Sequence, residues 1–181
     1  MAFAPRSVRL SAVVMTAGLT LMSAPAFAAL KVGDKAPAFT VDAATNGAVH
    51  SFRLKTALKK GPVVVYFYPK AFTGGCSLEA RQFSESMDRF AAKKISVVGL
   101  SADDVPTLQK FSQADCGGKF PVGSDKGAKI AETYDAKLPE KAMSGRVSYI
   151  IGKDGRIAFV HDSKDAASHV PSLLAAVESL K

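Results

Sequence analysis

Hydrophobic residues along the chain form two short uninterrupted runs and several spaced sets. The runs at 63–68 and 95–100 are rich in β-branched and aromatic residues, which is typical of strands buried on both faces. Between them, apolar residues including Phe83 and Phe90 recur at helical spacing, so a helix over about 76–94 should pack one face on the sheet. The order strand, helix, strand predicts parallel pairing with a crossover.

The second half of the chain continues with helical and hairpin patterns. Residues 101–104 offer capping groups to a second helix, and a short helix is expected at about 127–134. Apolar runs at 147–151 and 156–160 are separated by turn-forming residues, which indicates a hairpin. A terminal amphipathic helix follows, with Ser168 as its expected N-cap.

The order of these elements indicates the fold class. Minor edge strands are expected on either side of a polar loop at 45–47, before the first buried run. Two strand–helix units followed by a hairpin and a terminal helix describe a thioredoxin-like α/β fold, a central mixed sheet flanked by helices. We expect it to occupy residues 29–181 as one domain.

The first 28 residues have the pattern of a secretory signal peptide. Two arginines precede an apolar stretch at 10–22, and Ala26-Phe27-Ala28 forms a small-x-small cleavage site before Ala29. An uncleaved membrane anchor is the competing interpretation, but polar residues and Pro25 interrupt the segment. We therefore expect export, to the bacterial periplasm, with no stable membrane association after cleavage.

Charge and histidine content exclude several classes of function. The formal net charge is +8, and removing the two signal-segment arginines leaves +6 on the mature chain. Lysines alternate with acidic residues and no aromatic–basic module is present, so no nucleic-acid partner is expected. His50, His161 and His169 are not spaced with cysteines as metal ligands, and no metal or other cofactor is expected.

Cys76 is the leading candidate for chemistry. It follows the buried 63–68 strand and lies at the expected first turn of the next helix. Unpaired backbone N–H groups and the positive end of the helix macrodipole favour an ionised sulfur at that position. The sequence therefore predicts that Cys76 is a nucleophile at neutral pH.

The residues around Cys76 resemble those of the peroxiredoxins. Pro69, Thr73 and Cys76 have the spacing of that family's P-x-x-x-T-x-x-C motif, and Arg146 matches its active-site arginine. The likeness covers nearly all of the mature chain. Residues 76–80 are similar to the Q-type branch, also called bacterioferritin-comigratory proteins.

The resemblance implies a peroxidase that reduces hydrogen peroxide or small organic hydroperoxides without a cofactor, with a thioredoxin-like protein as reductant. Arg146 would stabilise the thiolate and hydrogen-bond the peroxide oxygens, while the Thr73 hydroxyl can donate and accept. Pro69 lacks an N–H and would shield the pocket from water. Two alternatives stay open for Glu79, which either orients Arg146 or faces solvent.

Cys116 has three possible roles. Some Q-type proteins carry the resolving cysteine five residues after the first, where this chain has Arg81; others carry it on the following helix, which Cys116 matches. A resolving Cys116 would condense with oxidised Cys76, helped by the flexible Gly117-Gly118 pair. The alternatives are a permanent bridge closing a loop of about 40 residues and a bystander thiol.

Two other functions compete with the peroxidase. A thiol–disulfide oxidoreductase would share the fold but is expected to carry C-x-x-C, and position 79 is Glu. A non-catalytic binding domain with a structural disulfide would need neither Thr73 nor Arg146.

Overall fold

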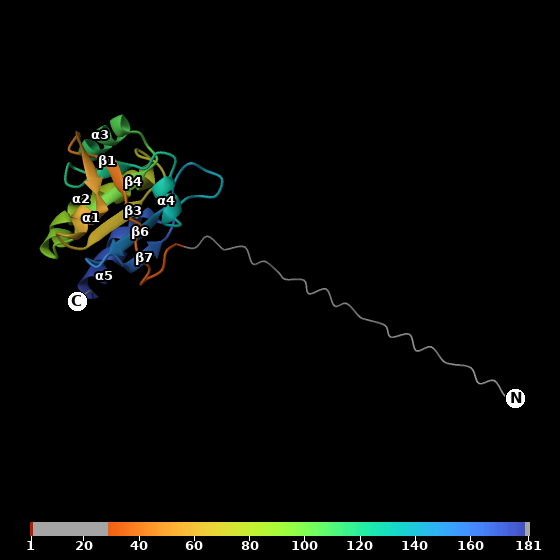
Figure 1. Cartoon of the computed structure of the whole chain (residues 1–181). Helices are drawn as coiled ribbons and strands as arrows, with labels where there is room; N and C mark the ends of the chain where they lie inside the picture. Colours follow the sequence, from red (N-terminus) through yellow and green to blue (C-terminus); the bar gives the residue numbers. More distant parts are fainter. Residues whose placement is uncertain (2–28, 180–181) are drawn as a thin grey trace.

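The fold is built on a seven-stranded mixed sheet with the order β2-β1-β5-β4-β3-β6-β7, seen between the helices in Figure 1. The computed structural model describes Met1 and residues 29–179, so the expected signal segment lies outside the described residues except for Met1. The strands are β1 (Thr40–Thr45), β2 (Ala48–Arg53), β3 (Val63–Phe67), β4 (Ser96–Ser101), β5 (Val122–Ser124), β6 (Val147–Ile151) and β7 (Ile157–Asp162). The helices are α1 (Leu54–Leu58), α2 (Gly74–Ala92), α3 (Val105–Ala114), α4 (Lys129–Thr133), the 3-10 helix η1 (Ala166–Ser168) and α5 (His169–Ser179).

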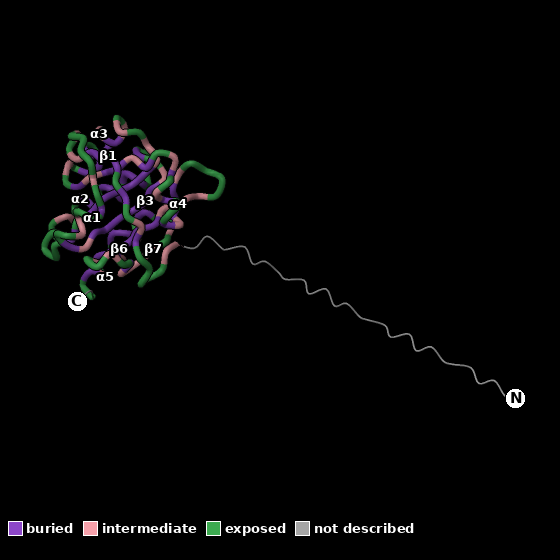
Figure 2. The backbone as a smooth tube through the Cα atoms, in the orientation of Figure 1, coloured by how far each residue is buried: buried purple, intermediate pink, exposed green. Residues whose placement is uncertain are grey.

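Strand β3 is the centre of the sheet. It pairs in parallel with β4 and antiparallel with β6, and all five of its residues are buried. Its side chains alternate between two hydrophobic layers, with Val64 and Tyr66 on one face and Val63, Val65 and Phe67 on the other. The buried segments drawn in purple in Figure 2 lie mainly in these central strands. The expected parallel crossover and buried strands are confirmed.

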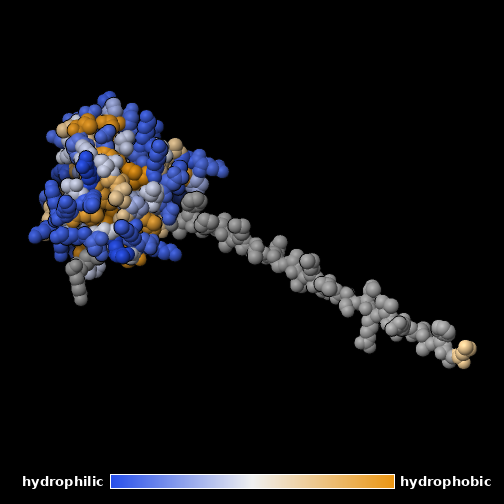
Figure 3. All heavy atoms as spheres, in the orientation of Figure 1, coloured by the Kyte–Doolittle hydropathy of each residue, from blue (hydrophilic) through white to orange (hydrophobic). Residues whose placement is uncertain are grey.

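Helices cover both faces of the sheet. The layer on one face includes Phe83 and Phe90 from α2, Phe111 from α3 and Leu173 from α5. The opposite layer includes Leu54 at the start of α1 and residues of α4. Hydrophilic side chains cover most of the face shown in Figure 3, with smaller hydrophobic groups between them. Each helix within residues 29–179 is too short or too polar to cross a lipid bilayer.

The local sequence pattern predicts the start of one helix correctly and the start of another incorrectly. Asp104 caps α3 as expected, since its carboxylate accepts a hydrogen bond from the Thr107 N–H. The expectation that Ser168 caps the terminal helix is wrong. The helical segment begins three residues earlier, at Ala166 of η1, and the Asp165 carboxylate accepts from the Ala167 N–H. The Ser168 hydroxyl instead donates to the Asp165 carbonyl oxygen.

The edge of the sheet agrees with the expected minor strands. Strands β1 and β2 form a hairpin around Asn46-Gly47, both of which have positive φ angles, as such tight turns require. Of these two strands, only β2 lies at the edge of the sheet, because β1 also pairs with β5. The short elements α1 and β5 were not expected, since five and three residues are too few to show a periodicity.

Candidate active site

Cys76 is the third residue of α2, directly beyond the carboxyl end of β3. Thr73 takes the N-cap position with extended backbone, and the first helical hydrogen bond runs from the Ser77 N–H to the Thr73 carbonyl oxygen at 2.8 Å. The N–H groups of Gly74, Gly75 and Cys76 therefore have no carbonyl partner within the helix. Cys76 is only 1% exposed, so its sulfur meets this positive helix end in a nearly dry environment.

Arg146 reaches the same sulfur from another part of the chain. Val147 pairs with Phe67 in the antiparallel β3–β6 ladder, which places the preceding Arg146 beside the exit of β3. Its Nη2 donates to the Cys76 Sγ at 3.3 Å. Burial lowers the pKa of Arg146, but Glu79 and Cys76 outweigh that effect and raise the pKa above its ordinary value, so the guanidinium stays charged.

Glu79 holds the other side of the guanidinium. Its side chain is fully buried, and its Oε2 accepts a hydrogen bond from Arg146 Nη1. The structure thus decides between the two roles left open for Glu79, because the carboxylate orients Arg146 and does not face solvent. The sequence signal for this inward orientation is the position of Glu79 three residues after Cys76, which places both side chains on the same side of the helix.

Pro69 and Thr73 lie in the loop between β3 and α2. Pro69 is half-buried, and the loop is tied to the end of β4 by the Ala71 N–H, which donates to Asp103 Oδ2 at 2.7 Å. The Thr73 hydroxyl donates to the Lys70 carbonyl oxygen at 3.0 Å and does not cap α2. Thr73 is thus the N-cap of α2 by its backbone alone, because its side chain closes the loop that precedes the helix.

Cys116 follows α3 and is fully buried. It belongs to the same hydrophobic layer as Cys76, and both are free thiols, so no permanent bridge joins them here. Burial and, secondarily, the neighbouring Asp115 carboxylate raise the pKa of the Cys116 thiol. The two cysteines therefore share one core but have different electrostatic surroundings.

Comparison with known proteins gives the family. Residues 32–160 match the model of the AhpC/TSA family. The chain belongs to this family. It is 31% identical over 147 residues to peroxiredoxin Bcp of Escherichia coli K12, covering 77% of this chain and 90% of that protein.

Solved structures agree with this assignment. The crystal structure of peroxidoxin BcpB from Mycobacterium tuberculosis superposes with a TM-score of 0.76 and 29% identity, covering 84% of this chain and 99% of that one. The reduced 2-Cys peroxiredoxin of Plasmodium vivax, at a TM-score of 0.74 and 22% identity, covers 82% of this chain and 94% of that one and shares the fold. The chain is thus a thiol peroxidase of the peroxiredoxin family with a peroxide substrate, and its thioredoxin-like fold is confirmed.

Behind Glu79, the site of this peroxiredoxin continues into a buried polar network. His169 Nε2 donates to the Ser163 carbonyl oxygen at 2.9 Å, so its Nδ1 is the acceptor for the Ser148 hydroxyl at 2.7 Å. Glu79 Oε1 lies 3.6 Å from that Nδ1 and has no hydrogen-bond partner among the described residues. This second carboxylate oxygen is therefore desolvated without compensation.

Burial shifts both ionisable groups toward their neutral forms. Burial raises the pKa of Glu79 to about 7, although Arg146 opposes the shift. Burial likewise lowers the pKa of His169 to about 4, with the hydrogen bond to the Ser163 carbonyl acting in the other direction. Near neutral pH, the His169 ring is uncharged and Glu79 is close to its own titration point.

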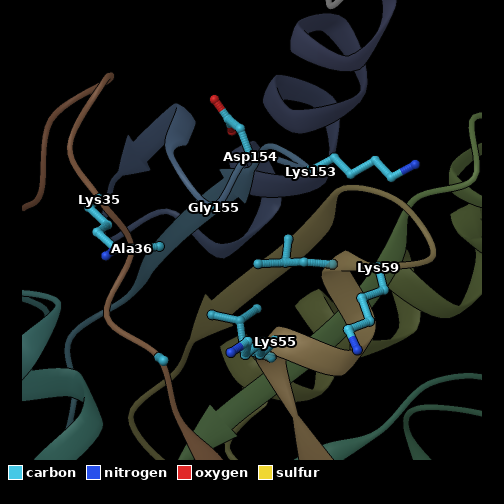
Figure 4. Close-up of a pocket in the computed structure, with 10 residues that line it drawn as sticks. Lys35, Ala36, Lys55, Lys59, Lys153, Asp154 and Gly155 are labelled. Atoms are coloured by element: carbon cyan, nitrogen blue, oxygen red, sulfur yellow. The ribbon is translucent and has the colours of Figure 1, made fainter.

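A cavity of about 670 Å³ lies at the other end of the sheet and is drawn in Figure 4. It is lined by Lys55 of α1, by Lys59 directly after that helix and by the turn at Lys153-Asp154. That turn follows Ile151, which pairs with Val63 at the start of β3, so the strand's roughly 16 Å length separates the cavity from Cys76. In residues 29–179, no three histidine, cysteine or acidic side chains converge as a metal site.

We predict a pH-dependent effect of Glu79→Gln on stability. Between pH about 4.5 and about 7 the folded protein keeps a proton on Glu79 that the unfolded chain loses, so this contribution to stability falls as pH rises. The unfolding free energy of the wild type minus that of the variant should decrease by up to about 3 kcal/mol across that window. Urea unfolding of both proteins at several pH values measures it, and a difference that is constant or increases with pH contradicts the prediction.

Proposed function

We propose that the Cys76 thiolate attacks the O–O bond of hydrogen peroxide or a small organic hydroperoxide. The sulfur becomes a sulfenic acid, and the departing oxygen leaves as an alkoxide or hydroxide that takes a proton to form alcohol or water. The observation that carries this proposal is the 3.3 Å contact between Arg146 Nη2 and the Cys76 Sγ at the start of α2. The permanent positive charge of Arg146 and the free helix N–H groups then stabilise the negative charge as it moves from the Cys76 sulfur to the departing oxygen.

The remaining site residues prepare this attack. Glu79 positions Arg146, because its buried carboxylate accepts from one nitrogen of the guanidinium while another reaches the sulfur. The Thr73 hydroxyl donates a hydrogen bond to the Lys70 carbonyl oxygen, which leaves the lone pairs of its own oxygen to accept a hydrogen bond from the peroxide. Pro69 presents no N–H to water at the edge of the site.

Cys116 is proposed as the resolving cysteine. Its thiol condenses with the Cys76 sulfenic acid, which forms an intramolecular disulfide and releases water. The shared hydrophobic layer and the 2.8 Å hydrogen bond between Ser77 Oγ and Asp115 Oδ2 support this role, because they bring the segments of the two cysteines together. A thioredoxin-like dithiol protein would then reduce the disulfide. The similarity to Bcp and BcpB supports placement in the Q-type branch.

Export to the bacterial periplasm is the second part of the proposal. The arginine-led apolar segment and the Ala26-Phe27-Ala28 site support cleavage before Ala29. The mature enzyme would remove peroxide outside the inner membrane and would need a reductant that works in that compartment.

The two cysteines give a direct test of the reaction. With excess dithiol and peroxide, Cys76→Ser is expected to abolish peroxide consumption, because it removes the nucleophile. Cys116→Ser is expected to consume one equivalent rapidly when no external thiol is present, since attack precedes resolution. Fast reduction of insulin disulfides with slow peroxide loss would favour a thiol–disulfide oxidoreductase, and inactivity in both assays would favour a binding domain.

Arg146→Lys tests the electrostatic argument. A single ammonium cannot hold both the sulfur and the Glu79 carboxylate in a fixed fork, so the rate constant for peroxide reduction should fall about 100-fold. Arg156→Lys is the matched control, because Arg156 is exposed and donates to the Gly33 carbonyl oxygen. Stopped-flow mixing with peroxide measures both variants, and equal rates would contradict the assigned role of Arg146.

Export is tested with the full chain expressed in a Gram-negative host. We expect the periplasmic fraction to contain protein whose N-terminus is Ala29, because the small residues at 26 and 28 fit a signal peptidase site. N-terminal sequencing and intact mass identify the product. Recovery of an uncleaved chain in the cytoplasm or the membrane fraction would refute the proposal.

A further inference from the structure

The cavity at the far end of the sheet lies outside the peroxidase site. Three segments surround it in Figure 4, residues 35–38 before β1, helix α1 with Lys59 after it, and the turn at 153–155 between β6 and β7. Its volume of about 670 Å³ is in the range of small-molecule sites, about 300 to 1,000 Å³. The length of β3 separates it from Cys76, so it has no part in the attack on peroxide.

Main-chain hydrogen bonds hold the walls of this cavity in place. The Ala36 N–H donates to the Gly155 carbonyl oxygen at 2.9 Å, which ties the 35–38 segment to the turn. The Leu54 N–H donates to the Phe39 carbonyl oxygen at 3.2 Å, which ties the start of α1 to the end of the same segment. The shape of the cavity is therefore set by the fold, and such pre-organisation lowers the conformational cost of binding.

The interior of the cavity is aliphatic and is kept open by small residues. Residues 35–38 and the turn contribute Ala36, Ala38 and Gly155, which carry at most a methyl group, and α1 contributes Leu54 and Leu58. Gly155 has a φ of +79°, so a larger residue there would be strained. A hydrocarbon chain in this space would be removed from water against the two leucines, and each buried methylene would add to the affinity.

Unpaired positive charges surround this aliphatic interior. Four exposed lysines line the cavity, and we call them the lysine rim: Lys35, Lys55, Lys59 and Lys153. Within residues 29–179 none of them forms an ion pair. Asp154, the one acidic side chain among the described lining residues, accepts a hydrogen bond from the Arg156 N–H at 3.1 Å. Lys55 and Lys59 are four residues apart, a spacing at which like charges repel, so an anion between them would be stabilised.

The lining also limits the chemical class of the ligand. Among the described lining residues there is no aromatic ring to stack on a nucleobase, and no hydroxyl or amide side chain to bind the hydroxyl groups of a sugar. The side chains present complement an aliphatic chain at one end of a ligand and a negative charge at the other.

We propose that this cavity binds an anionic amphiphile with a single aliphatic chain, of the fatty-acid class. The carboxylate lies at the lysine rim and the chain lies against Leu54 and Leu58. The proposal does not depend on the chemistry of Cys76 or Cys116, because the cavity and the reacting sulfur are at opposite ends of β3. Binding to the folded chain alone would also raise the melting temperature as ligand is added.

The first test separates the contributions of charge and chain. The reduced protein is titrated by calorimetry with decanoate below its micelle concentration, with 1-decanol and with acetate. Decanoate is expected to bind at one site and decanol about tenfold more weakly, because decanol lacks the charge, and acetate should give no measurable binding. Sodium chloride at about 0.5 M should weaken the binding of decanoate and leave that of decanol unchanged, since salt screens the exposed lysine charges.

Two variants place this binding in the cavity. Lys55→Glu with Lys59→Glu should weaken decanoate binding about tenfold, because two attractions at the rim become repulsions. The matched control is Lys126→Glu with Lys129→Glu, which reverses two exposed lysines outside the cavity and should bind decanoate like the wild type. Ala38→Phe places a ring in the cavity from an exposed position without changing charge, and it should abolish binding of both decanoate and decanol.

Peroxide consumption checks that every variant is folded, since none of these substitutions lies near Cys76 and each protein should keep the wild-type rate. The proposal is overturned if decanoate does not bind, or if it binds to both cavity variants as tightly as to the wild type. Sedimentation with phosphatidylglycerol vesicles tests a membrane surface as the other source of anionic amphiphile. Vesicle binding that depends on Lys55 and Lys59, without binding of decanoate, would also overturn it.

Discussion

The site depends on the shared guanidinium of Arg146. One of its nitrogens reaches the Cys76 sulfur and another binds the buried Glu79 carboxylate, so a single charge serves two acidic groups. The antiparallel register of β3 and β6 brings it there, because Val147 pairs with the last residue of β3 and α2 begins shortly afterward.

The guanidinium is held in place at an electrostatic cost. Glu79 is removed from water, and one of its oxygens has no hydrogen-bond partner in the described part of the chain, which is why burial raises its pKa to about 7. The His169 ring beside it remains neutral because burial lowers its pKa to about 4. The burial of Glu79 thus lowers the local stability while it fixes the position of Arg146, as is common where polar groups are buried for function.

The two cysteines illustrate how one hydrophobic layer can support different chemistry. Cys76 faces the positive end of α2 and Arg146, whereas Cys116 follows the Asp115 carboxylate and is buried beside α2. Cys76 thus lies beside a permanent positive charge, whereas burial, with Asp115 as a lesser cause, raises the pKa of the Cys116 thiol. Hydrogen bonds from Ser77 and Arg81 to the Asp115 carboxylate connect the start of α2 with the end of α3, where these two environments lie.

The sequence by itself determined the buried strands, the long helix α2, the hairpin and the placement of Cys76 at a helix start. These features depend on hydrophobic periodicity and on residues a few positions apart, which local geometry controls. Only the tertiary structure decided that Glu79 points inward, that Asp165 begins the terminal helical segment, and that Arg81 meets Asp115 across 34 residues. Polar pairing of this kind follows from which faces the sheet topology brings together. Spacing along the chain can indicate the face of a helix on which a side chain lies, as for Glu79, but not the partner that it meets.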